Sequence, residues 1–228
     1  MAGAPRLVCL ESINPMRSRI KQPRGSSVRD HLVEVAYQLF LRNGIRRVGI
    51  DTILAKSGNA KATLYKHFRS KTDLTIAALE LHDMRWTRRW LEAQIQERKR
   101  LPIEQLTAIF DIFNDWFNSG YFEGCLFISV LLEFPRGGRE RRAAAAHLAR
   151  IREIARKLAR DAGLSRPNQF SQIWHMLMKG AILSAGEGNR RAAREAKAAA
   201  RVVLDAWPRV AKPRSRAAAS PTKLSISS

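Results

Sequence analysis

The chain has 228 residues, and its 41 Lys and Arg against 20 Asp and Glu give a formal charge of +21 at pH 7. So large a basic excess is typical of a protein that binds a polyanion, and the length allows one or two domains with a substantial core. The two cysteines, Cys9 and Cys125, are far apart and form no CxxC pair, which argues against a disulfide scaffold or a zinc site.

The longest apolar run, Cys125–Leu132, is too short to cross a bilayer. The first residues lack the apolar core of a secretory signal. We therefore expect a cytoplasmic protein without a membrane partner.

Helical patterns follow one another along the chain, and no alternating run is long enough to predict a sheet. Residues 1–26, rich in Pro, Arg, Ser and Gly, are predicted to be a flexible basic arm. Ser27 is the expected N-cap of a helix over 28–43, which ends at Asn43-Gly44. Further helices are predicted over 50–56, 61–67, 71–96, 102–118, 125–134, 139–162, 167–185 and 191–207, with a disordered basic tail over 209–228. The sequence thus predicts an all-α protein of about nine helices.

The most informative stretch, Asp51–Phe68, is predicted to form two short helices joined by a tight turn at Ser57-Gly58-Asn59. The first helix carries apolar residues suited to burial, namely Ile50, Ile53 and Leu54. The second carries residues suited to a polyanion, namely Thr63, Tyr65, Lys66 and His67. This is the layout of a helix-turn-helix, whose second helix enters the DNA major groove.

Residues from about Val28 to Leu81 resemble the DNA-binding domain of the TetR family of bacterial transcriptional regulators (TetR/AcrR type). The first-helix pattern is matched by Leu32, Ala36, Leu39, Phe40 and Gly44. The family's TLYxHFxSKxxL segment is matched by Thr63-Leu64-Tyr65-Lys66-His67-Phe68, then Ser70, Lys71 and Leu74. The resemblance implies a three-helix DNA-binding domain over 27–86 and an effector-binding and dimerisation domain over 87–208.

Two positions depart from the family pattern. The turn holds Asn59-Ala60, where a small apolar residue and a capping Ser are usual, so Asn59 is expected to cap the second helix one residue early. The preceding helix is entered through Val48-Gly49 instead of Thr-Ser, which removes a hydroxyl that commonly meets phosphate.

The predicted DNA contacts combine base edges and phosphates. The residues expected to face the bases are Lys61, Ala62, Thr63 and Lys66. The resemblance implies phosphate or groove-edge contacts from Tyr65 and His67, and a phosphate clamp at Lys71. Further phosphate contacts are expected from Arg46, Arg47 and Thr52. The alternative is that Tyr65 and His67 are packing residues and that Arg46, Arg47 and Lys66 are solvated charges. Leu64 and Phe68 are assigned to the core.

The segment Trp116–Phe134 resembles the central region of TetR-family effector domains, which implies a small hydrophobic effector. The candidate pocket residues are Trp86, Trp90, Phe113, Trp116, Phe117, Tyr121, Phe127, Glu133, Trp174, His175 and Met178. The alternative is that this aromatic set is ordinary core. Cys125 is interpreted as a buried apolar residue in preference to a redox sensor.

The last two predicted helices are the dimer interface that the resemblance implies. One predicted stripe comprises Ile173, Leu177, Ala181 and Ser184, and the facing one comprises Ala192, Ala196, Ala199 and Val203. The alternative is that both stripes pack within one subunit.

Catalytic signatures are not found in the sequence. The five histidines form no HExxH motif or metal cluster, and neither GxSxG nor a P-loop is present. We expect no enzyme activity, cofactor or metal. The expected function is ligand-responsive repression from a palindromic operator by a homodimer. The alternatives are a nonspecific nucleoid-type DNA binder and an all-helical ligand-binding or enzymatic protein.

Overall fold

The computed structural model describes residues 27–210, so the predicted arm and residues 211–228 of the predicted tail lie outside the described residues. Within this range the named elements are helices, which confirms the all-α prediction. They are α1 (Val28–Asn43), α2 (Ile50–Ser57), α3 (Lys61–His67), α4 (Lys71–His82), η2 (Asp83–Leu91), α5 (Glu92–Arg98), α6 (Pro102–Phe117), α7 (Leu126–Glu133), α8 (Arg139–Asp161), α9 (Pro167–Gly186) and α10 (Ala192–Ala206). Because α4, η2 and α5 follow one another without a break, they form a single long helix.

Helix α1 begins and ends where the sequence predicts. The Ser27 hydroxyl accepts a hydrogen bond from the Asp30 amide at 3.2 Å, and the Asp30 carboxylate accepts one from the Ser27 amide at 3.4 Å. This reciprocal capping satisfies amides that a helix N-terminus otherwise leaves unpaired. Gly44 ends the helix with φ of +76°, a backbone conformation that favours glycine.

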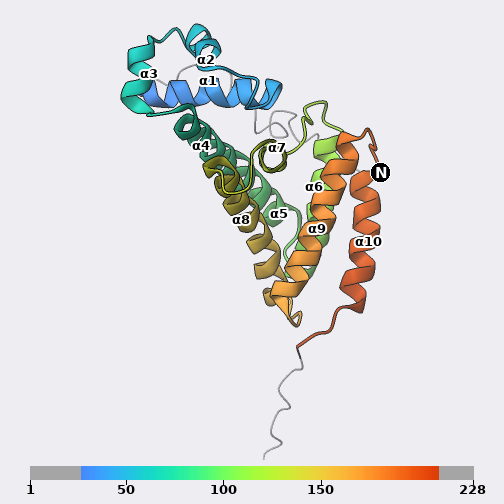
Figure 1. Cartoon of the computed structure of the whole chain (residues 1–228). Helices are drawn as coiled ribbons and strands as arrows, with labels where there is room; N and C mark the ends of the chain where they lie inside the picture. The colour runs from blue at the N-terminus through green and yellow to red at the C-terminus, as the bar shows by residue number, and fades with distance from the viewer. Residues whose placement is uncertain (1–26, 211–228) are drawn as a thin grey trace, which may run out of the picture.

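Helices α1, α2 and α3 form a small head at one end of the molecule, at the upper left of Figure 1. Its centre contains fully buried side chains from all three helices, among them Leu32, Phe40, Ile53 and Leu64. Helix α1 also packs along α4, so the head is joined to the remaining helices through the start of the long helix.

The middle of the long helix is wound more widely than an α-helix. Over η2 the backbone follows a π-helix, which the sequence did not predict. Its buried residues are Asp83, Trp86, Thr87, Trp90 and Leu91. A π segment adds a residue to a turn and changes which side chains face inward. Here it directs both tryptophans into the core.

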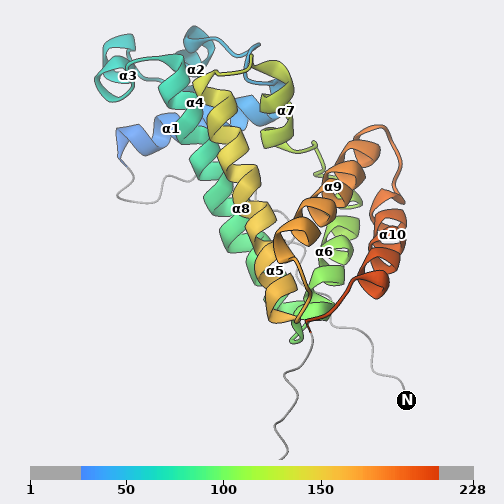
Figure 2. The same cartoon turned by 60° about the horizontal axis from the view of Figure 1, so that its bottom comes forward.

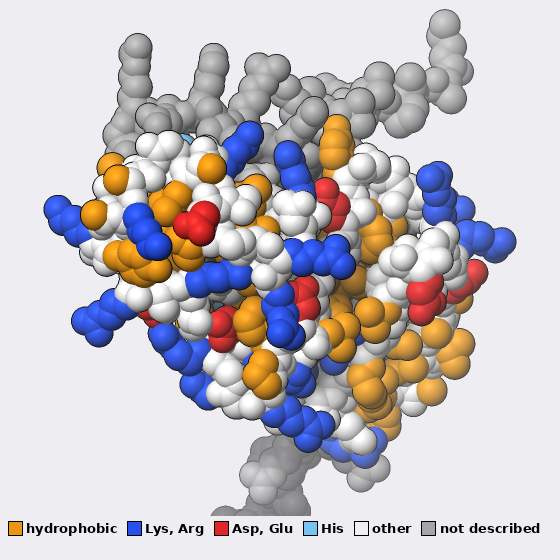
Figure 3. Space-filling view, turned by 45° about the horizontal axis from the view of Figure 1, so that its top comes forward, with side chains coloured by type: hydrophobic (Ala, Val, Ile, Leu, Met, Phe, Trp, Pro, Cys, Tyr) orange, Lys and Arg blue, Asp and Glu red, His pale blue; other side chains and the backbone are white. Residues whose placement is uncertain are grey.

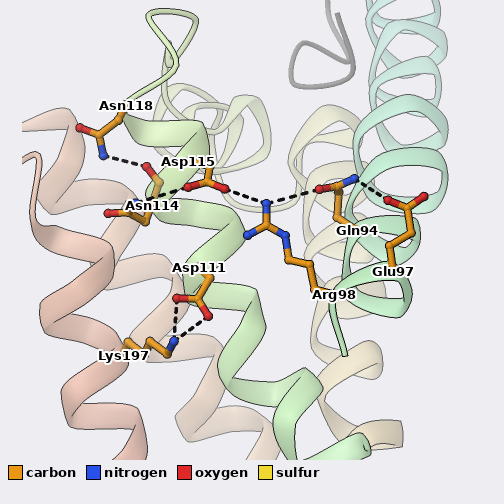
Figure 4. A network of polar contacts seen from close by, with 8 residues as sticks. All are labelled: Gln94, Glu97, Arg98, Asp111, Asn114, Asp115, Asn118 and Lys197. Carbon is orange, nitrogen blue, oxygen red and sulfur yellow. Dashed lines mark hydrogen bonds and ion pairs between the residues drawn. The ribbon is translucent and has the colours of Figure 1, made fainter. Parts of the chain in front are cut away.

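The remaining helices form the body. Helix α8 packs on α4, α6, α7 and α9, and α10 packs on α6 and α9 (Figure 2). Polar contacts attach α6 to its neighbours on both sides (Figure 4): Arg98 of α5 bonds Asp115 at 2.7 Å, and Lys197 of α10 bonds Asp111 at 2.6 Å. These pairs are partly exposed, so they add little stability beyond the apolar packing.

The end of the described chain is attached to the loop between α8 and α9. The Val210 amide donates to the Gly163 carbonyl at 2.9 Å, and the Ser165 amide donates to the Pro208 carbonyl at 2.9 Å. These bonds place Arg209 in a β-bridge with Leu164, so residues 209 and 210 of the predicted disordered tail are ordered here.

Candidate nucleic-acid interface

The turn between α2 and α3 is closed by its own backbone. Gly58 takes up the left-handed conformation, with φ of +68°, and its amide donates to the Leu54 carbonyl at 2.9 Å. The N-cap of α3 is Ala60 and makes no side-chain cap bond. The prediction that Asn59 caps α3 is wrong, because the Asn59 amide group donates to the Ser57 carbonyl at 3.1 Å and closes the turn instead.

Helix α3 divides into a buried and an exposed side. Leu64 is fully buried and Phe68, just after the helix, is 3% exposed, as predicted. The exposed residues are Lys61, Ala62, Tyr65, Lys66 and His67, and Thr63 is half-buried. Tyr65 is 46% exposed, so the alternative that it is a core residue does not describe this structure. The helix thus presents cations, a phenol and an imidazole away from the protein.

The flanking residues predicted to meet phosphate also belong to the head. Arg46, Arg47 and Thr52 are exposed. A small hollow between the end of α1 and the start of α2 is lined by Arg42, Asn43, Arg47, Val48 and Thr52. Sequence reasoning missed Arg42. Its position in the last turn of α1 was the available signal, since this turn leads directly to the loop that carries Arg46 and Arg47.

Lys71 does not lie as the phosphate-clamp prediction supposed. Its ammonium group donates to the carbonyl of Ile45 at 2.7 Å and lies 3.5 Å from that of Arg46. The side chain is half-buried, because it reaches under the loop between α1 and α2. In this structure the hydrogen bonds of Lys71 therefore go to the loop backbone.

The aromatic residues predicted to line a pocket mostly pack on one another. Trp86, Phe113, Trp116 and Phe117 are buried, and the Trp86 and Trp116 ring centroids are 5.1 Å apart. Trp90 joins the same cluster, 5.4 Å from Trp86. Such offset and edge-to-face contacts fill space and stabilise a core. These aromatic residues therefore pack as ordinary core, which was the alternative to a ligand pocket.

The other predicted pocket residues lie in different places. Trp174 packs on Phe110 and Phe170, and Phe110 in turn contacts Phe113 of the first cluster. Met178 is buried as well. Phe127 stacks on His147, with centroids 4.8 Å apart. These side chains belong to the same hydrophobic core as the first cluster.

Three polar pocket predictions need correction. Tyr121 is 41% exposed on the loop after α6. Glu133 lies against the head, where its side chain accepts from the Arg46 amide at 3.4 Å. His175 is 4% exposed, and burial, followed by the charges of Lys179 and Arg152, lowers its pKa to about 4. A neutral imidazole is thus buried between α8 and α9.

A groove of about 550 Å³ lies between η2–α5 and α8. Its apolar lining is Ile95, Ile154 and Leu158. Its polar lining carries both signs of charge and two amides: Arg88, Glu92, Gln96, Gln105, Arg150, Glu153, Lys157 and Asp161. None of these residues was predicted to bind a ligand, because their mixed charges give the same sequence pattern as a solvated helix surface.

The predicted dimer stripes face partly inward. Ala181 and Ala192 are buried within the subunit, and the partly buried Leu177, Ala196 and Val203 pack on the core. Ile173 and Ser184 are half-buried, whereas Ala199 is exposed. The large apolar side chains that these helices expose are instead Met176, Leu183 and Val202. The sequence did not indicate which faces of α9 and α10 point outward, because Ala and Leu occur on both faces of these helices.

Helix α3, the second helix of the α2–α3 motif, is exposed on a three-helix head that is joined to a helical body. This arrangement defines a helix-turn-helix DNA-binding regulator. The family model "Bacterial regulatory proteins, tetR family" matches residues 32–78. Residues 32–78 thus match the TetR family of bacterial regulatory proteins, and the relatives that the chain matches are named as transcriptional regulators.

The relatives differ in how much of the chain they match. The regulator QacR of Staphylococcus aureus is 30% identical over 70 residues, which cover 31% of this chain and 37% of QacR. The repressor NemR of Escherichia coli is 26% identical over 166 residues, covering 69% of this chain and 83% of NemR. The crystal structure of SCO4454, a TetR-family regulator from Streptomyces coelicolor, superposes with a TM-score of 0.70 at 25% identity, covering 84% of this chain and 97% of that one.

The described residues offer no basis for a metal site or a membrane span. Between residues 27 and 210, no group of three or more His, Cys, Asp or Glu is placed to hold a metal ion. No helix in the same range is both long and apolar enough for a bilayer.

Proposed function

We propose that this regulator binds a palindromic operator as a homodimer, represses transcription, and responds to a small effector bound in its body. The observation that carries the proposal is α3, where Lys61, Tyr65 and Lys66 are exposed around a buried Leu64. A short exposed helix with cations at its surface fits the major groove, where side chains reach base edges.

The roles proposed for the head separate positioning from specificity. Lys61, Thr63 and Lys66 are assigned to base edges, where Thr and Lys donate or accept hydrogen bonds. Phosphate contacts are assigned to Tyr65, His67, Arg47, Thr52 and the newly found Arg42. We retain residues 27–86 as the DNA-binding domain and 87–208 as the effector and dimerisation domain.

The proposed dimer interface is the exposed apolar face of α9 and α10. Met176 is 58% exposed, Leu183 50% and Val202 70%, and exposed Ala199 adjoins Val202 in the same helix. Hydrophobic side chains gather at the lower right of Figure 3, the side on which α9 and α10 lie in Figure 1. Two-fold pairing of this face would set two copies of α3 roughly 34–36 Å apart, the spacing of successive major grooves.

The proposed effector site is the groove between η2–α5 and α8. Its apolar lining and its charges of both signs suit an amphipathic molecule better than the small hydrophobic effector that the family resemblance implied. The groove is bordered by the long helix, which also carries the head. A ligand that binds the two states of this helix unequally would change DNA affinity.

The proposal is tested by recovering bound sequences from a random DNA pool and measuring affinity for a selected and a scrambled duplex at moderate salt. A preference of at least about a thousandfold is expected of specific binding. The alternative, a nonspecific nucleoid-type binder, draws support from the charge of +21. It predicts steep salt dependence with no preference between the two duplexes. For the effector, equal operator affinity with and without a groove ligand would contradict the regulatory mechanism.

A further inference from the structure

The loop that joins α1 to α2 is held from two sides by residues remote in the sequence. This loop, residues 44–49, carries Arg46 and Arg47 and leads into α2, so its conformation decides where these side chains lie relative to DNA. Its backbone offers carbonyl acceptors to one neighbour and an amide donor to another. The two neighbours are Lys71 and Glu133.

Lys71 holds the carbonyl side of the loop. It is the first residue of α4, and its ammonium group donates to the Ile45 carbonyl at 2.7 Å, with the Arg46 carbonyl at 3.5 Å. Burial lowers the pKa of Lys71, while the charges of Glu133 and Glu140 oppose this shift. Hydrogen bonds that an ammonium group donates to carbonyls are stronger than those between neutral groups, which suits Lys71 to holding the loop.

Glu133 holds the amide side of the same loop. It is the last residue of α7, and its carboxylate accepts from the Arg46 amide at 3.4 Å. Its own carbonyl accepts from the Arg46 guanidinium at 3.2 Å. The fit is close, since a Cβ added at Gly44 would lie 3.3 Å from the Glu133 carboxylate. An effector-domain residue therefore contacts both the backbone and the side chain of Arg46.

Two further polar contacts lie near this loop but do not involve it. Arg139 of α8 pairs with Asp73 at 2.7 Å, and the Thr72 hydroxyl donates to Glu140 at 2.5 Å. Both ties attach α8 to the first turn of α4. They provide matched controls, because removing them loosens α8 from the start of α4 without removing a hydrogen bond of the loop between α1 and α2.

We propose that Glu133 and Lys71 are positioning residues for DNA binding: together they clamp the loop of residues 44–49, and through Glu133 the body acts directly on the part of the head that meets phosphate. This inference rests on the proposed DNA-binding role of the head. It assigns Lys71 to the loop backbone in place of a phosphate, and it makes α7 a route by which a change in the body reaches the head.

The substitution Glu133→Ala tests the clamp by the sign of its effect. Removing a negative charge near DNA should by itself strengthen binding to a polyanion. The clamp predicts the opposite, a loss of about tenfold in operator affinity, the factor that a hydrogen bond to a charged group contributes. Glu140→Ala, which removes a nearby carboxylate without a loop contact, should leave affinity unchanged or slightly higher. Binding by Glu133→Ala at least as tight as the unmodified protein would overturn the proposal.

The substitution Lys71→Met separates positioning from phosphate contact. A lysine bound to phosphate contributes about 0.9 to the slope of log affinity against log salt. The clamp predicts weaker binding with an unchanged slope, whereas loss of a phosphate contact would lower the slope by that amount. The double variant should bind about as weakly as the weaker single variant, because both changes release one loop. A reduced slope or fully additive losses would contradict the clamp.

Amide hydrogen exchange at Arg46, measured without DNA, provides a readout that does not depend on the proposed function. Glu133→Ala should speed exchange at Arg46 while leaving the melting temperature and the α3 amides unchanged. Arg139→Ala should leave the Arg46 amide protected. Unchanged exchange in Glu133→Ala would refute the clamp even if operator recognition is established. If the unmodified protein shows no sequence preference, the proposed function fails on its own, and the exchange result still decides the clamp.

Discussion

Leu64 and Tyr65 are consecutive residues of α3 with opposite environments. Leu64 has no exposed surface, whereas Tyr65 is 46% exposed. Consecutive residues on a helix point about 100° apart, so one can anchor the helix in the head while the next projects from it. This division allows stability and DNA affinity to be changed separately.

Replacing Tyr65 by Ala should weaken operator binding by roughly tenfold, the loss of one hydrogen bond with its contact area. Because the side chain is exposed, the urea midpoint of unfolding should change little. Tyr121→Ala is the matched control, since Tyr121 is 41% exposed but belongs to the body. Equal DNA affinities of the two variants would contradict the assignment of Tyr65.

Replacing Leu64 by Ala should act through stability. Truncation of a fully buried leucine costs about 2–5 kcal/mol of unfolding free energy, since it removes buried surface and leaves a cavity. Urea titration followed by circular dichroism measures this loss. A cost below about 1 kcal/mol would mean that α3 is not anchored as the structure indicates.

At the scale of elements, the sequence predicted best what depends on local signals. Ser27 and Gly44 bound α1 as expected because capping and left-handed glycine are short-range properties. The π segment was missed because its wider winding depends on how Trp86 and Trp90 pack against other helices. Glu133 was placed in the wrong site because its partner, Arg46, is 87 residues away, and nothing local indicates that contact.

Buried polar residues join α1, the long helix and α8. The Tyr37 hydroxyl lies 3.1 Å from His82 Nδ1, and Asp83 pairs with Arg150 at 3.0 Å. Phe127 of α7 and His147 of α8 also face this cluster. Burial, reinforced by His147 and opposed by Asp83, lowers the pKa of His82 to about 3. The imidazole of His82 is therefore neutral at physiological pH.

The buried histidines predict acid sensitivity. The pKa values of His82 and His175 fall from 6.5 to about 3 and about 4, so below pH 6.5 the unfolded chain binds protons that the native state does not. Stability is then complete above about pH 6.5 and decreases as the pH falls toward the native pKa values, by about 2 kcal/mol for each histidine between pH 7 and 5. Urea titrations at these two pH values measure the change.

His175→Gln should remove about half of the histidine-linked loss between pH 7 and 5, because glutamine does not titrate. His67→Gln is the control, since His67 is exposed on α3. A pH dependence that is the same in His175→Gln and in the unmodified protein would show that His175 does not contribute.

At the scale of the whole molecule, the head and the α9–α10 face must act together. One copy of α3 contacts only a few base pairs, so specific recognition requires a second copy at a fixed distance. In the proposed dimer the apolar face of α9 and α10 supplies the surface for this pairing, while basic side chains are spread over the face that Figure 3 shows.

Val202→Glu should convert the dimer into a monomer, because it places a charge in an apolar interface. Sedimentation should report the monomer mass, and operator affinity should fall by at least about a hundredfold because each head then binds alone. Leu132→Glu is the control: Leu132, at the surface of α7, is 77% exposed and lies outside this face. If the Val202→Glu protein remains dimeric, the interface must lie elsewhere on the molecule.

The central claim, that two exposed α3 helices read one operator, is tested most directly by selecting bound duplexes from a random DNA pool with the unmodified protein at moderate salt. The account predicts an inverted repeat whose half-sites lie one helical turn apart, about 10 base pairs centre to centre. A pool that remains random after selection, or one enriched only in unpaired half-sites, would contradict it.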